Sequence, residues 1–266
     1  MNESKIEGIP YLGQRTDEIT IYAGPCSVES AEQFDEVAAC VKGLGLSWIR
    51  GGAFKPRTNP HSFQGLGEEA LKIMRAAGEK HGLMTLTEVM DSAHCQLVAD
   101  YVDGLQVGAR NFQNFSLLKK IGEVTADTRQ MVLYKRGFAG TVAEWLAATD
   151  YITDKGNTNV VLCERGIRTF ETATRFTLDI AAVPVIHKQS LYPVCIDVSH
   201  PAGQRDLVPA LALAAVAAGA YSLMIEVHPN PPAALSDGPQ QLTPAQFEQL
   251  VAELRVVAEA MGKRIV

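Results

Sequence analysis

The feature that most constrains the fold is a regular alternation of short apolar runs with longer segments of helical periodicity. The runs are rich in β-branched residues, which favours strands. We predict strands over 19–24, 47–51, 84–89, 104–108, 131–135, 160–163, 194–198 and 223–227. Helical patterns lie between them, for example over 31–44, 68–81, 142–153, 206–218 and 244–261. Strands that alternate with helices in this way form βαβ units and a parallel sheet.

Eight such units in a chain of 266 residues favour a closed barrel over an open doubly wound sheet. The (β/α)₈ or TIM barrel is an α/β fold that typically takes about 250 residues. No Pro- or Ser-rich linker divides the chain, so we predict a single domain. We expect a short N-terminal extension over 1–18 and the barrel over 19–266.

Composition limits the partners of the chain. The net charge of −6 argues against a broad surface for nucleic acid or for an anionic membrane. The apolar stretch 207–227 is long enough to span a membrane, but it is rich in Ala and ends near Glu226, so we predict a buried helix followed by a buried strand. The five widely spaced cysteines include no C-x-x-C pair, and the first residues lack an apolar signal core; both favour the reducing cytoplasm.

Polar residues gather at one end of the predicted strands. The stretches at the carboxyl ends are AGPC (23–26), RGGAFKPRT (50–58), TEVMD (87–91), VGARN (107–111), YKRG (134–137), CERGIR (163–168), DVSH (197–200) and EVHP (226–229). The amino-terminal ends of the same strands carry fewer charged and metal-binding residues. Because the loops after the strands carry the chemistry of barrel enzymes, this asymmetry predicts an active site at that rim.

Many of these residues are cations: Arg50, Lys55, Arg57, Arg110, Lys135, Arg136, Arg165 and Arg168. Any one of them alone is more simply explained as a solvated surface charge. Their joint position on one rim instead favours a site that holds phosphate and carboxylate oxygens through charge-assisted hydrogen bonds.

A second group offers metal ligands: Cys26, His200, Glu226 and Asp237. In a barrel the first strand lies beside the eighth and the seventh beside the eighth, so these side chains can meet. A thiolate, an imidazole and two carboxylates suit Mn, Fe, Co or Zn. His228 competes with Glu226, because residues two apart on a strand point the same way, and spacing alone does not choose between them.

These stretches, together with LSDGPQ (235–240), resemble 3-deoxy-D-arabino-heptulosonate 7-phosphate (DAHP) synthase in its short, metal-dependent form without a regulatory domain. The matching motifs keep their order from Ala23 to about Gln240. The resemblance implies condensation of phosphoenolpyruvate with erythrose 4-phosphate, with release of phosphate, as the first step of the shikimate pathway. It also implies a homo-oligomer, a dimer or tetramer, and a divalent metal, with Mn preferred.

The resemblance also assigns site residues. The metal ligands would be Cys26, His200, Glu226 and Asp237. Phosphoenolpyruvate would be held by Arg50, Lys55, Arg110, Lys135, Arg165 and the backbone N–H of Ala109. Glu88 would order a water, and the phosphate of the aldose would bind Arg57 and Thr58 beside Lys55 and Pro56. Lys55 or Lys135 would act as a general acid if neighbouring cations lower its pKa, or would only bind substrate anions.

Three other functions fit parts of the sequence. A 3-deoxy-D-manno-octulosonate 8-phosphate synthase, which uses arabinose 5-phosphate, resembles this chain but typically reads K-A-N-R-S where this chain reads Lys55-Pro56-Arg57-Thr58. A non-catalytic barrel that senses sugar phosphates would not need all four metal ligands. An unrelated metal-dependent hydrolase would not need so many cations on the rim.

Overall fold

The computed structural model describes residues 17–56, 59 and 61–266 and shows the predicted closed barrel. All pairings in it are parallel, and β1 pairs with both β2 and β8, which closes the sheet. The barrel strands are β1 (Glu18–Gly24), β2 (Trp48–Arg50), β3 (Met84–Val89), β4 (Gly104–Val107), β5 (Met131–Lys135), β6 (Val160–Glu164), β7 (Val194–Asp197) and β8 (Ser222–Glu226).

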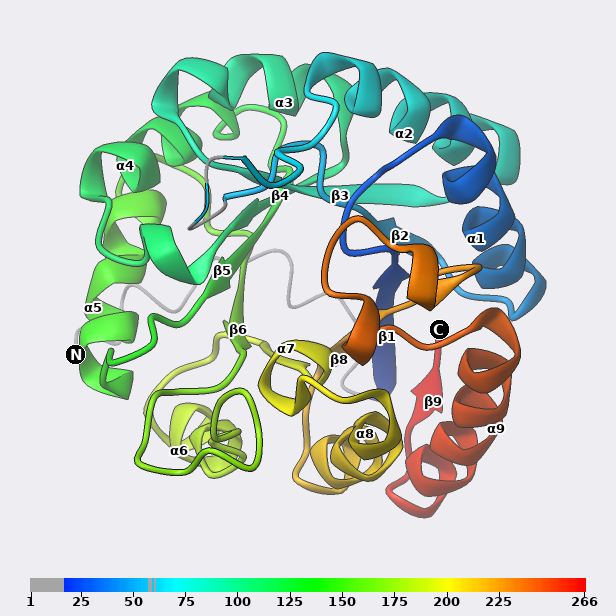
Figure 1. Ribbon diagram of the computed structural model, residues 1–266. Helices are drawn as coiled ribbons and strands as arrows, with labels where there is room; N and C mark the ends of the chain where they lie inside the picture. The colour runs from blue at the N-terminus through cyan, green and yellow to red at the C-terminus, as the bar shows by residue number, and fades with distance from the viewer. Residues whose placement is uncertain (1–16, 57–58, 60) are drawn as a thin grey trace.

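Helices surround the strands, as Figure 1 shows. They are α1 (Ala31–Gly43), α2 (Glu68–His81), α3 (Cys95–Tyr101), α4 (Phe115–Val124), α5 (Val142–Thr153), α6 (Ala182–Gln189), α7 (Ser199–Ala202), α8 (Val208–Ala217) and α9 (Pro244–Ala260). Local sequence fixes several of their starts: Ser30 caps α1, and Thr141 and Thr243 form capping boxes with residues three positions later.

The structure refines the sequence prediction at two places. The helix predicted over 206–218 divides into a short 3₁₀ turn, η5 (Arg205–Leu207), and α8, which has Pro209 in its first turn, where a missing N–H costs nothing. A short strand that was not predicted, β9 (Arg264–Ile265), pairs with Glu18 and Ile19 of β1. Within the described part of the chain, no helix has the length and hydrophobicity needed to cross a membrane.

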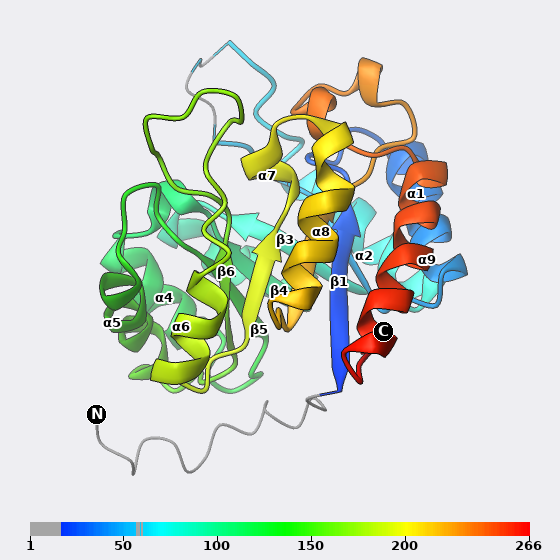
Figure 2. The same cartoon turned by 90° about the horizontal axis from the view of Figure 1, so that it is seen from below.

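Two apolar layers fill the structure. The larger lies between the strands and the helices. The smaller fills the inside of the barrel and consists of Tyr22, Trp48, Leu86, Met131, Leu133, Val161, Cys163, Cys195 and Met224. Because this interior is packed with side chains, the barrel is not a pore and polar chemistry is confined to its rims. Figure 2 shows the long loops gathered at the end toward which the strand arrows point.

Candidate active site and metal centre

The alternation of side chains along each strand explains why charged residues meet at the mouth of the barrel. Residues two apart on a strand point to the same side of the sheet. On five strands the inward apolar residue nearest the mouth is therefore followed, two positions later, by a polar one above it: Trp48 by Arg50, Leu86 by Glu88, Leu133 by Lys135, Cys195 by Asp197 and Met224 by Glu226. Arg165 stands two positions after Cys163, just past the end of β6. A short sequence pattern thus places ions directly above an apolar plug.

A cleft of about 310 Å³ lies at the mouth of the barrel, and Arg50, Glu88, Lys135 and Arg165 are among the residues that line it. Predicted site residues in its wall are Arg50, Lys55, Pro56, Glu88, Ala109, Arg110, Lys135, Arg165, His200 and Asp237. The wall also includes residues that the sequence analysis did not assign to the site: Asn59, Ser62, Gln106, Gly108, Phe138 and Arg175. The predicted aldose residues Arg57 and Thr58 lie outside the described residues.

Two of the cleft cations have buried donors that no described residue satisfies. Nη1 of Arg165 and Nε of Arg50 are buried and lack a hydrogen-bond partner within the described ranges. The guanidinium of Arg165 lies 4.9 Å from the ring centre of Phe138 and 4.4 Å from that of Phe176, which fixes its orientation. Burial lowers its pKa. Buried, unpaired guanidinium donors in a cleft are suited to an anionic ligand.

Two cations of the predicted group do not line this cleft. Nη1 of Arg136 lies 2.9 Å from Glu164 and 2.7 Å from Asp179, so its charge is used within the protein. The guanidinium of Arg168 lies 5.5 Å from the ring centre of Phe138. Position at the rim therefore predicts more cleft cations than the structure has. Arg136 comes one place after the inward-facing Lys135 and so faces the other side of the sheet, and Arg168 lies in the loop after β6.

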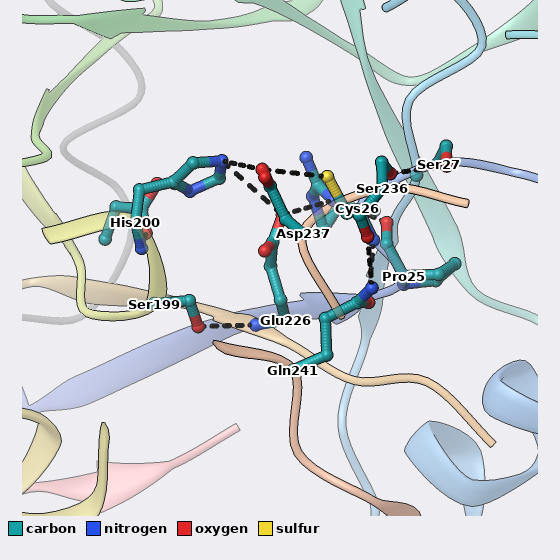
Figure 3. Close-up of polar contacts among 12 residues, drawn as sticks. Pro25, Cys26, Ser27, Ser199, His200, Glu226, Ser236, Asp237 and Gln241 are labelled. Carbon is teal, nitrogen blue, oxygen red and sulfur yellow. Dashed lines mark hydrogen bonds and ion pairs between the residues drawn. The ribbon is translucent and has the colours of Figure 1, made fainter. Parts of the chain in front are cut away.

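The four candidate metal ligands converge on one point at the edge of the cleft (Figure 3). One donor atom from each of Cys26, His200, Glu226 and Asp237 lies within 4.8 Å of the others. Sγ of Cys26 lies 3.4 Å from Oδ2 of Asp237, and Nε2 of His200 lies 3.5 Å from Oε1 of Glu226 and 3.8 Å from the same Asp237 oxygen.

This donor set fits a divalent transition metal. Metal–ligand bonds of about 2.0–2.3 Å place two donors on one ion roughly 3–4.6 Å apart, and the three separations above fall in that range. Burial, followed by the charge of Glu226, raises the pKa of the Cys26 thiol to about 12, so the free thiol is protonated at neutral pH and a bound cation would displace its proton. A thiolate, an imidazole and two carboxylates match Mn, Fe, Co or Zn.

His228, the alternative ligand, points elsewhere. β8 ends at Glu226, so the alternation of side chains does not continue to His228. Its Nδ1 accepts a hydrogen bond from the backbone N–H of Asn230 at 3.0 Å, and its Nε2 lies 3.4 Å from Oε2 of Glu29. Glu226 is therefore the donor that the structure brings to Cys26, His200 and Asp237.

A buried carboxylate that the sequence analysis did not assign links the metal donors to the cations. Oδ2 of Asp197 accepts a hydrogen bond from Nζ of Lys135 at 2.7 Å and lies 2.7 Å from Nδ1 of His200. Burial alone would raise the pKa of Asp197, but His200 and Lys135 outweigh it and hold that pKa well below its usual value. Carboxylates commonly orient metal-binding histidines in this way, so Asp197 aims Nε2 of His200 at the other donors.

Lys55 connects the metal donors to the cleft. Its Nζ lies 3.1 Å from both Sγ and the backbone oxygen of Cys26. Burial and the nearby charge of Arg50 act to lower the pKa of Lys55, but its contacts with Cys26, Glu226 and Glu88 outweigh them and raise it. The expectation that neighbouring cations lower the pKa of Lys55 toward neutrality is therefore wrong for this arrangement of charges.

The opposite wall depends on close backbone approach. Oε2 of Glu88 accepts a hydrogen bond from Gln106 at 3.2 Å. A Cβ added to Gly108 would lie 2.0 Å from Oε1 of Glu88, so a side chain at this position would displace the Glu88 carboxylate. Gly108 leads into the short turn η4 (Ala109–Asn111), which places the backbone of Ala109 in the cleft wall.

The parallel barrel carries a donor set for a divalent metal beside a cleft lined by buried guanidinium and ammonium groups. This combination is typical of metal-dependent barrel enzymes that act on anionic substrates. Within that class, the chain belongs to the DAHP synthetase I family, whose model matches residues 11–261. The family resemblance of the motifs is thereby confirmed.

Curated relatives and solved structures agree. The chain is 50% identical over 246 residues to phospho-2-dehydro-3-deoxyheptonate aldolase of Thermotoga maritima, covering 92% of this chain and 72% of that protein. The crystal structure of that DAHP synthase superposes with a TM-score of 0.90 at 49% identity, covering 94% of this chain and 72% of the other. A 2-dehydro-3-deoxyphosphooctonate aldolase of Caulobacter vibrioides is 34% identical over 271 residues, covering 93% of this chain and 90% of that protein.

Proposed function

We propose that this protein is a metal-dependent DAHP synthase, which condenses phosphoenolpyruvate with erythrose 4-phosphate and water to give DAHP and phosphate, the first step of the shikimate pathway. One observation carries the proposal. The metal donor set lies at the edge of the cleft that the cations line. Lys55 contacts Cys26, and Asp197 lies between His200 and Lys135, so both contacts join the donor set to the cations. The 50% identity to the Thermotoga maritima enzyme supports the same activity.

The cleft supplies groups for both anionic substrates. We assign the binding of phosphoenolpyruvate to five cations that line the cleft and to the backbone N–H of Ala109. The cations are Arg50, Lys55, Arg110, Lys135 and Arg165, and those of Arg50 and Arg165 include buried donors without a partner among the described residues. Glu88, in the same wall, would orient a water. Holding two anions side by side removes much of the entropic barrier to a bimolecular step, and it explains why so many cations meet in a protein of net charge −6.

The aldose is assigned to the loop that begins at Lys55. Lys55 and Pro56 line the cleft, and Arg57 and Thr58 follow them in the sequence as the proposed ligands of the aldose phosphate. Pro56 fixes its own φ and removes a backbone donor, which would shape the pocket. The KPRT stretch and the higher identity to the heptonate enzyme than to the octonate enzyme both favour erythrose 4-phosphate over arabinose 5-phosphate.

The reaction joins carbon 3 of phosphoenolpyruvate to the aldehyde carbon of the aldose. Water adds to carbon 2 of the former phosphoenolpyruvate, and the resulting hemiketal phosphate loses inorganic phosphate by C–O cleavage. A divalent ion held by Cys26, His200, Glu226 and Asp237, with Mn preferred over Fe, Co or Zn, would polarise the aldehyde as a Lewis acid. Lys55 and Lys135 both line the cleft, so either would be placed to donate a proton to the new hydroxyl or to bind the departing phosphate.

The direct test measures phosphate release with each substrate alone and with both together. We expect release to require phosphoenolpyruvate and erythrose 4-phosphate together, to fall by at least tenfold when arabinose 5-phosphate replaces the four-carbon sugar, and to stop after chelation and return with Mn²⁺. A difference of about 1.4 kcal/mol in transition-state binding gives that tenfold preference. Release from one substrate alone would identify a hydrolase, and no release with bound sugar phosphate would identify a sensor.

The cysteines bear on the compartment of the protein, and the family resemblance bears on its oligomeric state. All five cysteines are free thiols, and four of them are buried, which fits the reducing cytoplasm that the sequence predicts. A homo-oligomer, dimer or tetramer, is proposed from the family resemblance alone.

A further inference from the structure

Glu226 and Asp237 each point one carboxylate oxygen toward the other candidate metal ligands, while the second oxygen contacts a residue outside that set. Oδ2 of Asp237 lies 3.4 Å from Sγ of Cys26, and Oε1 of Glu226 lies 3.5 Å from Nε2 of His200. The same Oε1 also accepts a hydrogen bond from Nη1 of Arg50 at 3.4 Å. The other oxygen of each carboxylate is engaged elsewhere. Oε2 of Glu226 accepts a hydrogen bond from Nε2 of Gln240 at 2.6 Å, and Oδ1 of Asp237 lies 3.2 Å from Nη1 of Arg175.

Arg175 and Gln240 are themselves joined. The same Nη1 of Arg175 donates to Oε1 of Gln240 at 3.0 Å, so one nitrogen serves both the amide and the Asp237 carboxylate. Gln240 is only 2% exposed. Two of the three polar contacts of this pair occupy the second oxygens of Glu226 and Asp237, and the third satisfies the amide oxygen of Gln240. Packing supports the position of Arg175, because a Cβ on Gly203 would lie 2.8 Å from the Cβ of Arg175.

The segment that carries Asp237 and Gln240 is held on several sides. Arg205 donates to the backbone oxygen of Gly238 at 3.0 Å. The side chain of Gln241 accepts from the backbone N–H of Cys26 at 3.0 Å, so the next residue along the chain fixes a third donor (Figure 3). Asp237 itself has φ of +49°, a left-handed conformation that costs energy in a residue with a side chain. Such a conformation persists where surrounding contacts hold it.

We propose that Arg175 and Gln240 form a positioning bracket for the metal centre. The bracket occupies the outer oxygens of Glu226 and Asp237, so that each carboxylate presents one inner oxygen to the cation. It also ties the centre to the segment between β6 and α6, which carries Arg165 at its start and Arg175 further along. The inference rests on the proposed metal site and adds residues that determine its affinity.

The test compares the dissociation constant of Mn²⁺ in variants of the full chain, measured by equilibrium dialysis after removal of bound metal. Loss of a hydrogen-bond partner of a metal ligand typically costs about 10–100-fold in affinity, and we expect a loss in that range for Gln240→Leu and Gln240→Glu. Gln240→Glu keeps the shape and the acceptor for Arg175 but loses the donor to Glu226. Arg175→Lys, which keeps a charge, should retain more affinity than Arg175→Met.

Gln204→Leu is the matched control, because this glutamine lies on the same rim but donates to the backbone oxygen of Ala173 at 3.0 Å. It should bind Mn²⁺ as the wild type does. Thermal unfolding of the metal-free proteins separates positioning from a purely structural role, since Gln240→Glu should weaken Mn²⁺ binding beyond any loss of stability. Wild-type affinity in both Gln240 variants overturns the bracket alone. Failure of the wild-type chain to bind Mn²⁺ overturns the metal centre as well.

Discussion

Cys26→Ala loses divalent-metal binding and synthase activity together while the barrel stays folded. Cys26 is fully buried, and its Sγ is the only soft donor of the cluster. Removing one ligand should lower affinity by more than the roughly 10–100-fold that loss of a ligand's own partner costs. Because the Lewis acid contributes several kcal/mol, activity should fall by about 10³-fold. Equilibrium dialysis with Mn²⁺ and the two-substrate assay for phosphate release measure the two effects.

Cys95→Ala is the matched control for this variant. Cys95 is also fully buried, and burial also raises its thiol pKa to about 12, but it lies at the start of α3 in the layer between strands and helices. Truncation there should cost a small amount of stability and leave metal affinity and activity unchanged. Equal metal binding by Cys26→Ala and wild type would remove Cys26 from the ligand set.

Asp197→Asn should impair the metal centre and the cation cluster at once. The substitution keeps the size of the side chain but removes the charge that lies 2.7 Å from both Lys135 and His200. Uncompensated buried charge typically costs about 3–5 kcal/mol of stability, and misorientation of His200 should weaken Mn²⁺ binding by about 10–100-fold. Urea unfolding, equilibrium dialysis and the Michaelis constant for phosphoenolpyruvate report on the three consequences.

Glu164→Gln controls for the loss of a buried charge in itself. Glu164 ends the neighbouring strand β6, its side chain is fully buried, and it pairs with Arg136 at 2.9 Å. Its replacement should destabilise the protein to a comparable degree but leave the affinity for Mn²⁺ unchanged. If Asp197→Asn kept wild-type affinity for Mn²⁺, or if both variants lost it equally, the orienting role of Asp197 would be wrong.

The fold and the position of the rim could be predicted because they depend on short-range patterns. Period-two alternation and the breaks after each strand mark the barrel, and the same alternation lifts residues such as Arg50, Lys135 and Glu226 to its mouth. Residue type and position after the first and eighth strands made Cys26 and Asp237 candidate ligands, and the family resemblance then assigned them to the metal and favoured Glu226 over His228.

Partnerships between side chains could not be predicted in the same way. Asp197 stands in the DVSH stretch, but only the structure shows that it lies between His200 and Lys135. Gln240 closes the LSDGPQ stretch, but the stretch alone gives its amide no role, and Arg175 carries no signal because a loop arginine is common on any surface. The pKa of Lys55 depends on the balance of burial and Arg50 against Cys26, Glu226 and Glu88, which spacing in the sequence does not reveal.

The central claim is that one cation and two anions meet at the carboxyl ends of the strands. A crystal structure of the protein with Mn²⁺ and phosphoenolpyruvate, recorded with anomalous scattering at a wavelength suited to manganese, tests it most directly. We predict a single strong anomalous peak among Cys26, His200, Glu226 and Asp237, with the phosphate and carboxylate of phosphoenolpyruvate on Arg165, Lys135 and Arg50. A peak away from Cys26 and His200, or phosphoenolpyruvate bound outside the cleft, would contradict the account.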